Sequence, residues 1–100
     1  DSLSVQHATP EMRIDCPDAE KFGVMERLST YAKSAVPAAN LNLIDGVRVR
    51  SDRGWWLIRA SNTEAALVAR AEGKSAAILT QLVTDIETAL AAAGLQWTAP

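Results

Sequence analysis

Hydrophobic and polar residues alternate with two different periods along the chain, and the changes of period predict the order of its elements. From Met12, apolar and charged side chains alternate as far as Pro17, which is typical of a strand buried on one face. An apolar stripe at helical spacing follows and predicts an amphipathic helix over residues 18 to about 34, with Asp18 as its N-terminal cap. The positions that we expect this helix to bury are Phe22, Met25, Leu28, Ala32 and Ala35.

The second half of the chain predicts three strands joined by hairpins and then a closing helix. Residues 47–50 alternate as a half-buried strand does, and residues 51–54 supply a turn in which Gly54 is free to take a positive φ. Residues 55–60 and 66–72 are expected strands, and Ser75 is the expected cap of a helix that ends at Gly94. The stripe that this helix should bury is Ile78, Leu82, Ile86 and Leu90, with Leu79 and Val83 beside it.

The order strand, helix, three antiparallel strands, helix indicates an α+β domain with both helices on one face of the sheet. One hundred residues of which 48% are hydrophobic make one domain with a core of its own. We expect residues 1–8 to be a linker remnant, residues 9–96 to form the domain and residues 97–100 to be a tail.

Composition excludes several classes of partner. The net charge is −2 and the ten Lys and Arg residues are scattered, so nucleic acid is not an expected partner. No apolar stretch approaches the roughly 20 residues of a membrane-spanning helix. The single cysteine cannot form an internal disulfide and no secretory signal begins the chain, so a cytoplasmic location is expected.

The residues most often used in catalysis do not combine here. His7 has no assignable partner for a triad or a metal site, and Cys16 shares the apolar face of the first strand, where it is expected to be a small buried side chain. The carboxylates are spread over helix surfaces, and neither an acidic metal loop nor a glycine-rich phosphate loop is present. The chain alone is not expected to catalyse a reaction, to contain a catalytic residue or to bind a metal or cofactor.

The polar run from Arg59 to Glu64 follows an apolar strand directly and offers the donors of a phosphate-binding site. The guanidinium of Arg59 matches two phosphate oxygens, and Ser61, Asn62 and Thr63 add neutral donors, with several free backbone N–H groups expected beside them. Ser, Asn and Thr are also ordinary turn residues, so on chemistry alone the run could be a turn and nothing more. Glu64 would repel an anion, and we expect it to point outward or to pair with an arginine.

Four segments of the sequence carry a resemblance to a known family. These are ATPEMRIDCPDAEKF (residues 8–22), DGVRV (45–49), GWWLIRASNTE (54–64) and LVARAEG (67–73). They resemble the last domain of the α-D-phosphohexomutases, and within that family the bacterial phosphomannomutase/phosphoglucomutase branch. The resemblance spans nearly the whole chain and implies a curved antiparallel sheet of the TATA-binding-protein-like type.

The resemblance also implies an activity for a full-length enzyme. Such an isomerase interconverts hexose 1-phosphate and hexose 6-phosphate, of mannose or glucose, through a phosphoserine and a bisphosphorylated sugar. Its serine and the loop that holds its Mg²⁺ belong to earlier domains, and a glucose or mannose 1,6-bisphosphate activator is expected for the full enzyme. The preceding domains and the hexose phosphate are the expected partners. The last domain binds the non-reacting phosphate of the substrate, and the matching positions here are Arg59, Ser61, Asn62 and Thr63.

One departure from the family pattern, one residue that favours a branch of the family and three alternatives accompany this interpretation. Ala65 stands where the family usually has a proline, which leaves an extra backbone donor, and Asn62 favours the phosphomannomutase/phosphoglucomutase branch over phosphoglucosamine mutase, which typically has glycine there. Phosphoglucosamine mutase remains an alternative within the family. A regulatory ligand-binding domain and a purely structural interaction domain of similar build remain alternatives outside it.

Trp55 and Trp56 should face opposite sides of the sheet, and we expect the open face to meet a preceding domain.

Overall fold

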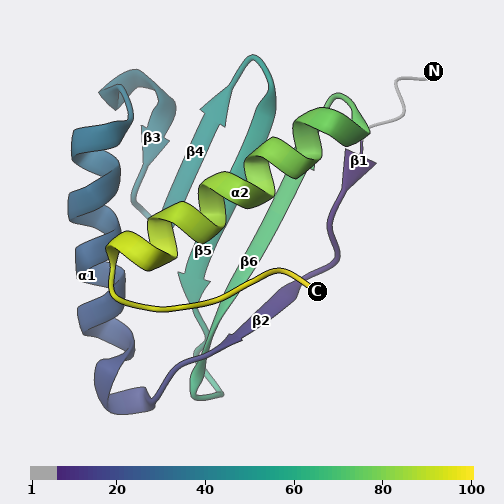
Figure 1. The fold of residues 1–100 in the computed structure, drawn as a ribbon. Helices are drawn as coiled ribbons and strands as arrows, with labels where there is room; N and C mark the ends of the chain where they lie inside the picture. The colour runs from purple at the N-terminus through teal and green to yellow at the C-terminus, as the bar shows by residue number, and fades with distance from the viewer. Residues whose placement is uncertain (1–6) are drawn as a thin grey trace.

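The computed structural model describes residues 7–100 and has the expected α+β fold (Figure 1). Its elements in chain order are β1 (His7–Ala8), β2 (Met12–Asp15), α1 (Asp18–Ala35), a short 3-10 helix (Ala38–Asn40), β3 (Leu41–Asn42), β4 (Val47–Ser51), β5 (Gly54–Ala60), β6 (Ala66–Gly73) and α2 (Ala76–Ala92). The predicted order is confirmed, with two additional two-residue strands, β1 and β3, at the edges.

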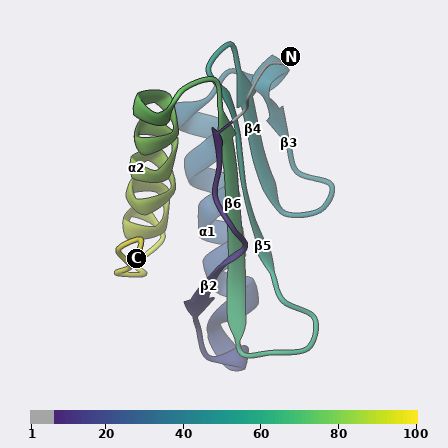
Figure 2. The ribbon, with the colours of Figure 1, turned by 90° about the vertical axis from the view of Figure 1, so that its right-hand side faces the viewer.

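All pairings within the sheet are antiparallel. The strands follow the order β1-β6-β5-β4-β3, and β2 pairs with β6 farther along the same edge. Both helices cover one face, as the edge-on view in Figure 2 shows, and α2 crosses the sheet diagonally in Figure 1. Within residues 7–100, neither α1 nor α2 lies on the opposite face of the sheet.

The core lies between the two helices and the covered face of the sheet. Alternation along the strands directs every second side chain into it, so Trp56 and Ile58 are buried while Trp55 faces the open side. The expected burial of alternate β6 residues is confirmed at Leu67, Ala69 and Ala71. From α2 the expected stripe is confirmed in its centre, where Leu82, Ile86 and Leu90 are fully buried, while Ile78, Leu79 and Val83 are half-buried.

Helix α1 buries Leu28 and Ala32 as expected, but the rest of its buried face differs from the expected stripe. Its buried residues are Lys21, Val24, Leu28 and Ala32, whereas Phe22 is 74% exposed and Ala35 is exposed. The expected stripe holds apolar residues only and so does not contain Lys21, although the set that includes Lys21 also has helical spacing. The expected cap is also wrong: Pro17 occupies the N-cap position, and the carboxylate of Asp18 bonds the side chain of Lys21 instead.

Both ends of the described chain take part in the fold. His7 and Ala8, which we expected to belong to the linker, pair with Gly73 and Glu72 of β6. Residues 1–6 of that expected linker lie outside the described residues. Trp97 and Ala99, within the expected tail, pack against the core, and the backbone N–H of Ala99 donates to Glu87.

The turn chemistry predicted at Gly54 and Gly94 and the cap predicted at Ser75 are confirmed. Gly54 and Gly94 adopt positive φ angles of 143° and 86°, and the Ser75 hydroxyl accepts from the backbone N–H of Ile78 at 3.1 Å. Neither of the two helices is both long and apolar enough to cross a membrane, within the described residues.

Candidate anion-binding site

Arg59 lies near the end of β5 and on the open face of the sheet. Its neighbours Ile58 and Trp56 alternate with it into the core, and this alternation directs the guanidinium away from the helices. Beside it is an open cavity of about 730 Å³. The polar and charged residues that line this cavity are Asn42, Asp45, Arg48, Arg59 and Asn62, and the apolar ones include Met25, Ile44 and Leu57.

The turn between β3 and β4 forms one side of the cavity, and Gly46 allows it to lie close to β5. Gly46 has a φ of 117°, and a Cβ added to it would lie 2.5 Å from the carbonyl oxygen of Ile58 and 2.9 Å from Cβ of Arg59. A side chain at this position would therefore displace the backbone that carries Arg59. This close approach is why the DGVRV segment and Arg59 belong to the same site although they lie on different strands.

The cavity is electropositive. It holds the guanidinium groups of Arg48 and Arg59 and a single carboxylate, that of Asp45. Arg48 lies over the indole of Trp55, with its central carbon 4.9 Å from the ring centroid, which orients its guanidinium. The side chain of Arg59 makes no hydrogen bond to residues 7–100, and its nearest ion-pair contact, to Glu11 Oε2, is long at 3.9 Å between exposed side chains. Its paired donors are therefore available to an anion.

The loop that joins β5 to β6 is closed by its own hydrogen bonds. Ser61 N–H donates to the carbonyl of Ala66 at 2.9 Å. The Ser61 hydroxyl accepts from the backbone N–H groups of Thr63 and Glu64, at 3.3 and 3.2 Å. The expectation of several free N–H groups is therefore wrong for these three, because the turn-forming tendency of serine consumes them. The N–H of Asn62 has no acceptor among the described residues.

The structure brings two of the four expected phosphate ligands into the cavity. Arg59 and Asn62 line it, whereas Ser61 and Thr63 do not. The Ser61 hydroxyl retains one proton to donate after accepting from the loop, and Thr63 is exposed at the tip of the loop. The four side chains lie at the end of β5 and on the loop that follows it, but only Arg59 and Asn62 border the cavity.

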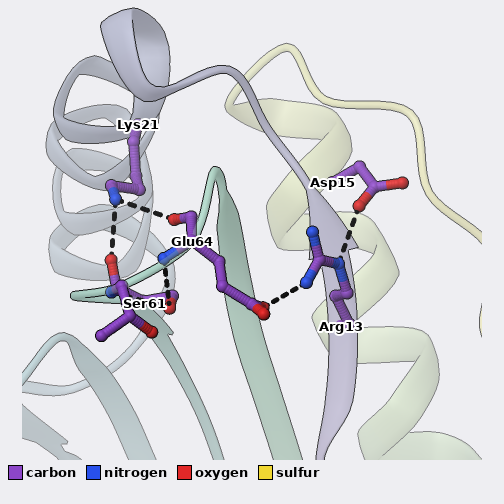
Figure 3. A network of polar contacts seen from close by, with 6 residues as sticks. Arg13, Asp15, Lys21, Ser61 and Glu64 are labelled. Carbon is purple, nitrogen blue, oxygen red and sulfur yellow. Dashed lines mark hydrogen bonds and ion pairs between the residues drawn. The ribbon is translucent and has the colours of Figure 1, made fainter.

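Glu64 pairs with an arginine, as expected. Its carboxylate contacts Arg13 of β2, and Arg13 also donates to Asp15 at 3.0 Å (Figure 3). The hydrogen bond to Asp15, with the nearby charge of Glu64, raises the pKa of Arg13. These contacts neutralise the one carboxylate within the polar run.

Sequence reasoning missed Arg48 and Lys21. Arg48 is an outward residue of a strand whose register sets it opposite Leu57, and only the pairing of β4 with β5 reveals that it borders the same cavity as Arg59. Lys21 contacts the loop from helix α1. Its spacing from Val24, Leu28 and Ala32 is helical, but its burial depends on carbonyl acceptors in the loop.

The residues associated with catalysis remain apart. Residues 7–100 hold no group of three or more His, Cys, Asp or Glu able to surround a metal ion, so they do not fit the Mg²⁺ that the resemblance implies for a full-length enzyme. Cys16 is buried as expected, and burial raises the pKa of its thiol, which disfavours the thiolate needed of a nucleophile.

Comparison with known proteins places this geometry in a family. The chain is 46% identical over 79 residues to a phosphomannomutase/phosphoglucomutase of Pseudomonas putida. The matched segment covers 79% of this chain but only 16% of that protein. It is 37% identical over 65 residues, 63% of its length, to a probable phosphoglucosamine mutase of Methanothermobacter thermautotrophicus, 14% of which is covered. The chain thus spans about a sixth of the length of these relatives.

A solved structure and a family model agree with these similarities. A crystal structure of a phosphoglucomutase/phosphomannomutase family protein from Burkholderia thailandensis superposes with a TM-score of 0.77 at 31% identity, over 98% of this chain and 20% of the other. Residues 11–89 match the model of the phosphoglucomutase/phosphomannomutase C-terminal domain. The chain therefore belongs to the phosphoglucomutase/phosphomannomutase C-terminal domain family.

Proposed function

We propose that this domain binds the non-reacting phosphate of a hexose phosphate in a full-length phosphohexomutase. The observation that carries the proposal is the cavity at the end of β5, in which Arg59 and Asn62 lie with a second guanidinium, that of Arg48. Membership of a family whose relatives are mutases of hexose phosphates supports the same interpretation.

The chemistry of the site suits a phosphate rather than a sugar. Arg59 would donate two parallel N–H bonds to phosphate oxygens, and Asn62, Ser61 and Thr63 would donate neutral ones. A charge-assisted bond of this kind is worth about 1.5 to 3 kcal/mol. The reaction inferred for the family requires the sugar to turn end for end between two phosphoryl transfers, so the site would receive the 1-phosphate in one half and the 6-phosphate in the other.

A site that recognises only the phosphate serves both orientations. Binding energy spent at this distant phosphate holds the opposite end of the substrate for in-line transfer. We infer that phosphoryl transfer itself, with its serine and its Mg²⁺, is performed by other parts of the enzyme and that this chain alone is inactive.

Amide NMR titrations of the chain with glucose 1-phosphate, mannose 6-phosphate and inorganic phosphate test the proposal. We expect all three to produce similar weak shifts at Arg59, Asn62 and Thr63, because only the phosphate is common to them. Arg59→Gln should weaken each by about ten- to a hundredfold, the equivalent of one charge-assisted pair.

Arg70→Gln is the matched control for Arg59→Gln. Arg70 is an exposed arginine on the same open face, paired with Leu57 in the sheet, but it does not line the cavity. Its replacement should change phosphate affinity by less than about twofold.

Other outcomes would favour the other classes of function. Tighter binding of a carboxylate or a nucleotide than of any hexose phosphate would indicate a regulatory ligand domain. The absence of any anion-dependent shift at the loop would leave a structural interaction domain.

A further inference from the structure

Lys21 is a buried cation that joins helix α1 to the candidate site. Its side chain is 8% exposed, and its ammonium lies beneath the loop between β5 and β6 (Figure 3). Nζ donates to Asp18 Oδ1 at 2.9 Å, to the carbonyl oxygen of Ser61 at 2.7 Å and to that of Glu64 at 3.0 Å. The three acceptors match the three donors of an ammonium, which makes its burial tolerable.

The two backbone bonds of Lys21 fix the orientation of two peptide groups in the loop. The chain contains no cis peptide bond in its described part. In a trans peptide the carbonyl of one residue and the N–H of the next point in opposite directions. Because the carbonyls of Ser61 and Glu64 point to Nζ, the N–H groups of Asn62 and Ala65 point away from it.

Among the described residues, these two N–H groups are the unused backbone donors of residues 61–65. Neither Asn62 N–H nor Ala65 N–H has an acceptor among residues 7–100, whereas those of Ser61, Thr63 and Glu64 are engaged. Asn62 also borders the cavity that holds Arg59. The two carbonyls that accept from Lys21 belong to Ser61 and Glu64, so they lie on either side of Asn62 and Thr63 in the sequence.

We propose that Lys21 is a positioning residue for the phosphate site, which holds the peptide groups of the loop so that Asn62 N–H is presented to the bound phosphate. The proposal rests on the proposed function, since it assigns Lys21 a role in that same site. The positive charge of Lys21 contacts the carbonyl oxygens of Ser61 and Glu64 and polarises their peptide groups. This polarisation strengthens the peptide dipoles, whose N–H ends would face the anion.

The test compares Lys21→Met, which keeps the length of the side chain, with Lys21→Arg, which keeps its charge. In Lys21→Met we expect phosphate affinity to fall about tenfold or more, the N–H signals of residues 61–65 to shift, and hydrogen exchange at Thr63 and Glu64 to accelerate. Lys21→Arg should recover part of the affinity, because a guanidinium can donate to the same two carbonyls.

Lys33→Met is the matched control. Lys33 is an exposed lysine in the last turn of the same helix, so its loss should leave both the loop signals and the affinity within about twofold. A Lys21→Met chain that is folded and binds inorganic phosphate as well as the unmodified chain would overturn the proposal, because a merely structural contact predicts that result.

A measurement on the unmodified chain keeps the proposal testable if Lys21→Met does not fold. The ammonium of Lys21 should give a slowly exchanging ¹⁵Nζ signal with couplings across its hydrogen bonds to the carbonyl carbons of Ser61 and Glu64, and phosphate should shift that signal together with Asn62 N–H. An ammonium signal that stays still while Asn62 shifts would contradict the proposed role. If phosphate shifts no loop signal in the unmodified chain, the proposed function fails, whereas intact binding in Lys21→Met refutes only the positioning role.

Discussion

The two ends of β5 are both held by a cation, but in opposite ways. At the Gly54 end, Arg53 extends from the turn to helix α2 and contacts Asp85 at 2.9 Å and Gln81 at 3.3 Å, with both partners of the ion pair about 40% exposed. At the Ala60 end, Lys21 extends from helix α1 into the loop, is almost fully buried and bonds backbone carbonyls.

The difference follows from what the backbone does at each end. The turn at Gly54 is short, and the bond from Lys74 N–H to the carbonyl of Arg53 at 3.2 Å joins it to the end of β6, so Arg53 adds a side-chain contact to a geometry already determined. The loop after Ala60 leaves the sheet, and the ammonium of Lys21 supplies bonding that strand pairing no longer provides there. A charge is important for structure where it replaces backbone pairing and adds little where it accompanies that pairing.

The largest expected effect tests the backbone at the Gly54 end. A Cβ at Gly54 would lie 2.0 Å from the carbonyl oxygen of Glu72, at a φ of 143°. Gly54→Ala should therefore lower the free energy of unfolding by more than about 3 kcal/mol, because both the dihedral strain and the clash must be relieved. Urea unfolding measures this change.

Gly23→Ala is the control for that substitution. Gly23 lies within helix α1, and an added Cβ would meet only a flexible arginine side chain at 3.5 Å. It should raise the free energy of unfolding by about 0.5 to 1 kcal/mol. Equal losses for both variants would show that the two glycines matter for some reason other than backbone geometry.

The next effect concerns the Ala60 end. Lys21→Met should cost about 1 to 3 kcal/mol of unfolding free energy, because it leaves the carbonyls of Ser61 and Glu64 without their donor. Thermal or urea unfolding measures the cost. A loss no larger than that of Arg53→Gln would remove the distinction between the two ends.

A pH titration of stability tests how well the Cys16 thiol, beside the loop between β5 and β6, is shielded from water. Cys16, whose N–H donates to the carbonyl of Ala65 at 3.1 Å, is buried there, and burial raises the pKa of its thiol. The unfolded chain releases the thiol proton near its ordinary pKa of about 8.5, whereas the folded chain retains it to higher pH. Stability should therefore be unaffected by this group below that pH and should fall above it, by up to about 1.4 kcal/mol per pH unit until the folded pKa is reached.

Cys16→Ala serves as the reference for this titration, because it removes the ionising group and retains a small apolar side chain. The difference in unfolding free energy between the two chains should be constant below about pH 8 and change above it. A constant difference up to pH 10 would indicate that the thiol is not shielded from water.

The smallest effect is expected for Arg53→Gln. Exposed ion pairs contribute about 0.2 to 1 kcal/mol, and this one is about 40% exposed on both sides. Raising the salt concentration should abolish the difference between the two chains in urea unfolding. A loss above 2 kcal/mol would place Arg53 in the same class as Lys21.

The sequence predicted those parts of the fold whose signals are local. The alternation before Pro17, the glycine turn at Gly54 and the cap at Ser75 each appear in a few neighbouring residues, and all are confirmed. The two short strands at the sheet edges gave no such signal, because a two-residue strand such as His7–Ala8 exists only through its partner β6.

The site was predicted only as far as it lies within one segment. The polar run after β5 contained Arg59 and Asn62, but the contribution of Arg48 depends on strand register and that of Lys21 on helix packing across 40 residues. Lys21 is absent from the expected stripe, which holds apolar residues only. Its burial depends on carbonyl acceptors that become known only once the loop is folded.

The stacking of Arg48 on Trp55 gives the molecule an optical reporter. Of the three tryptophans, Trp56 is buried in the core and Trp97 packs against it, while Trp55 lies on the open face in contact with a guanidinium that borders the cavity. An anion that attracts Arg48 would alter the electric field on that indole more than on the other two, so the emission of Trp55 would report occupancy without any added label.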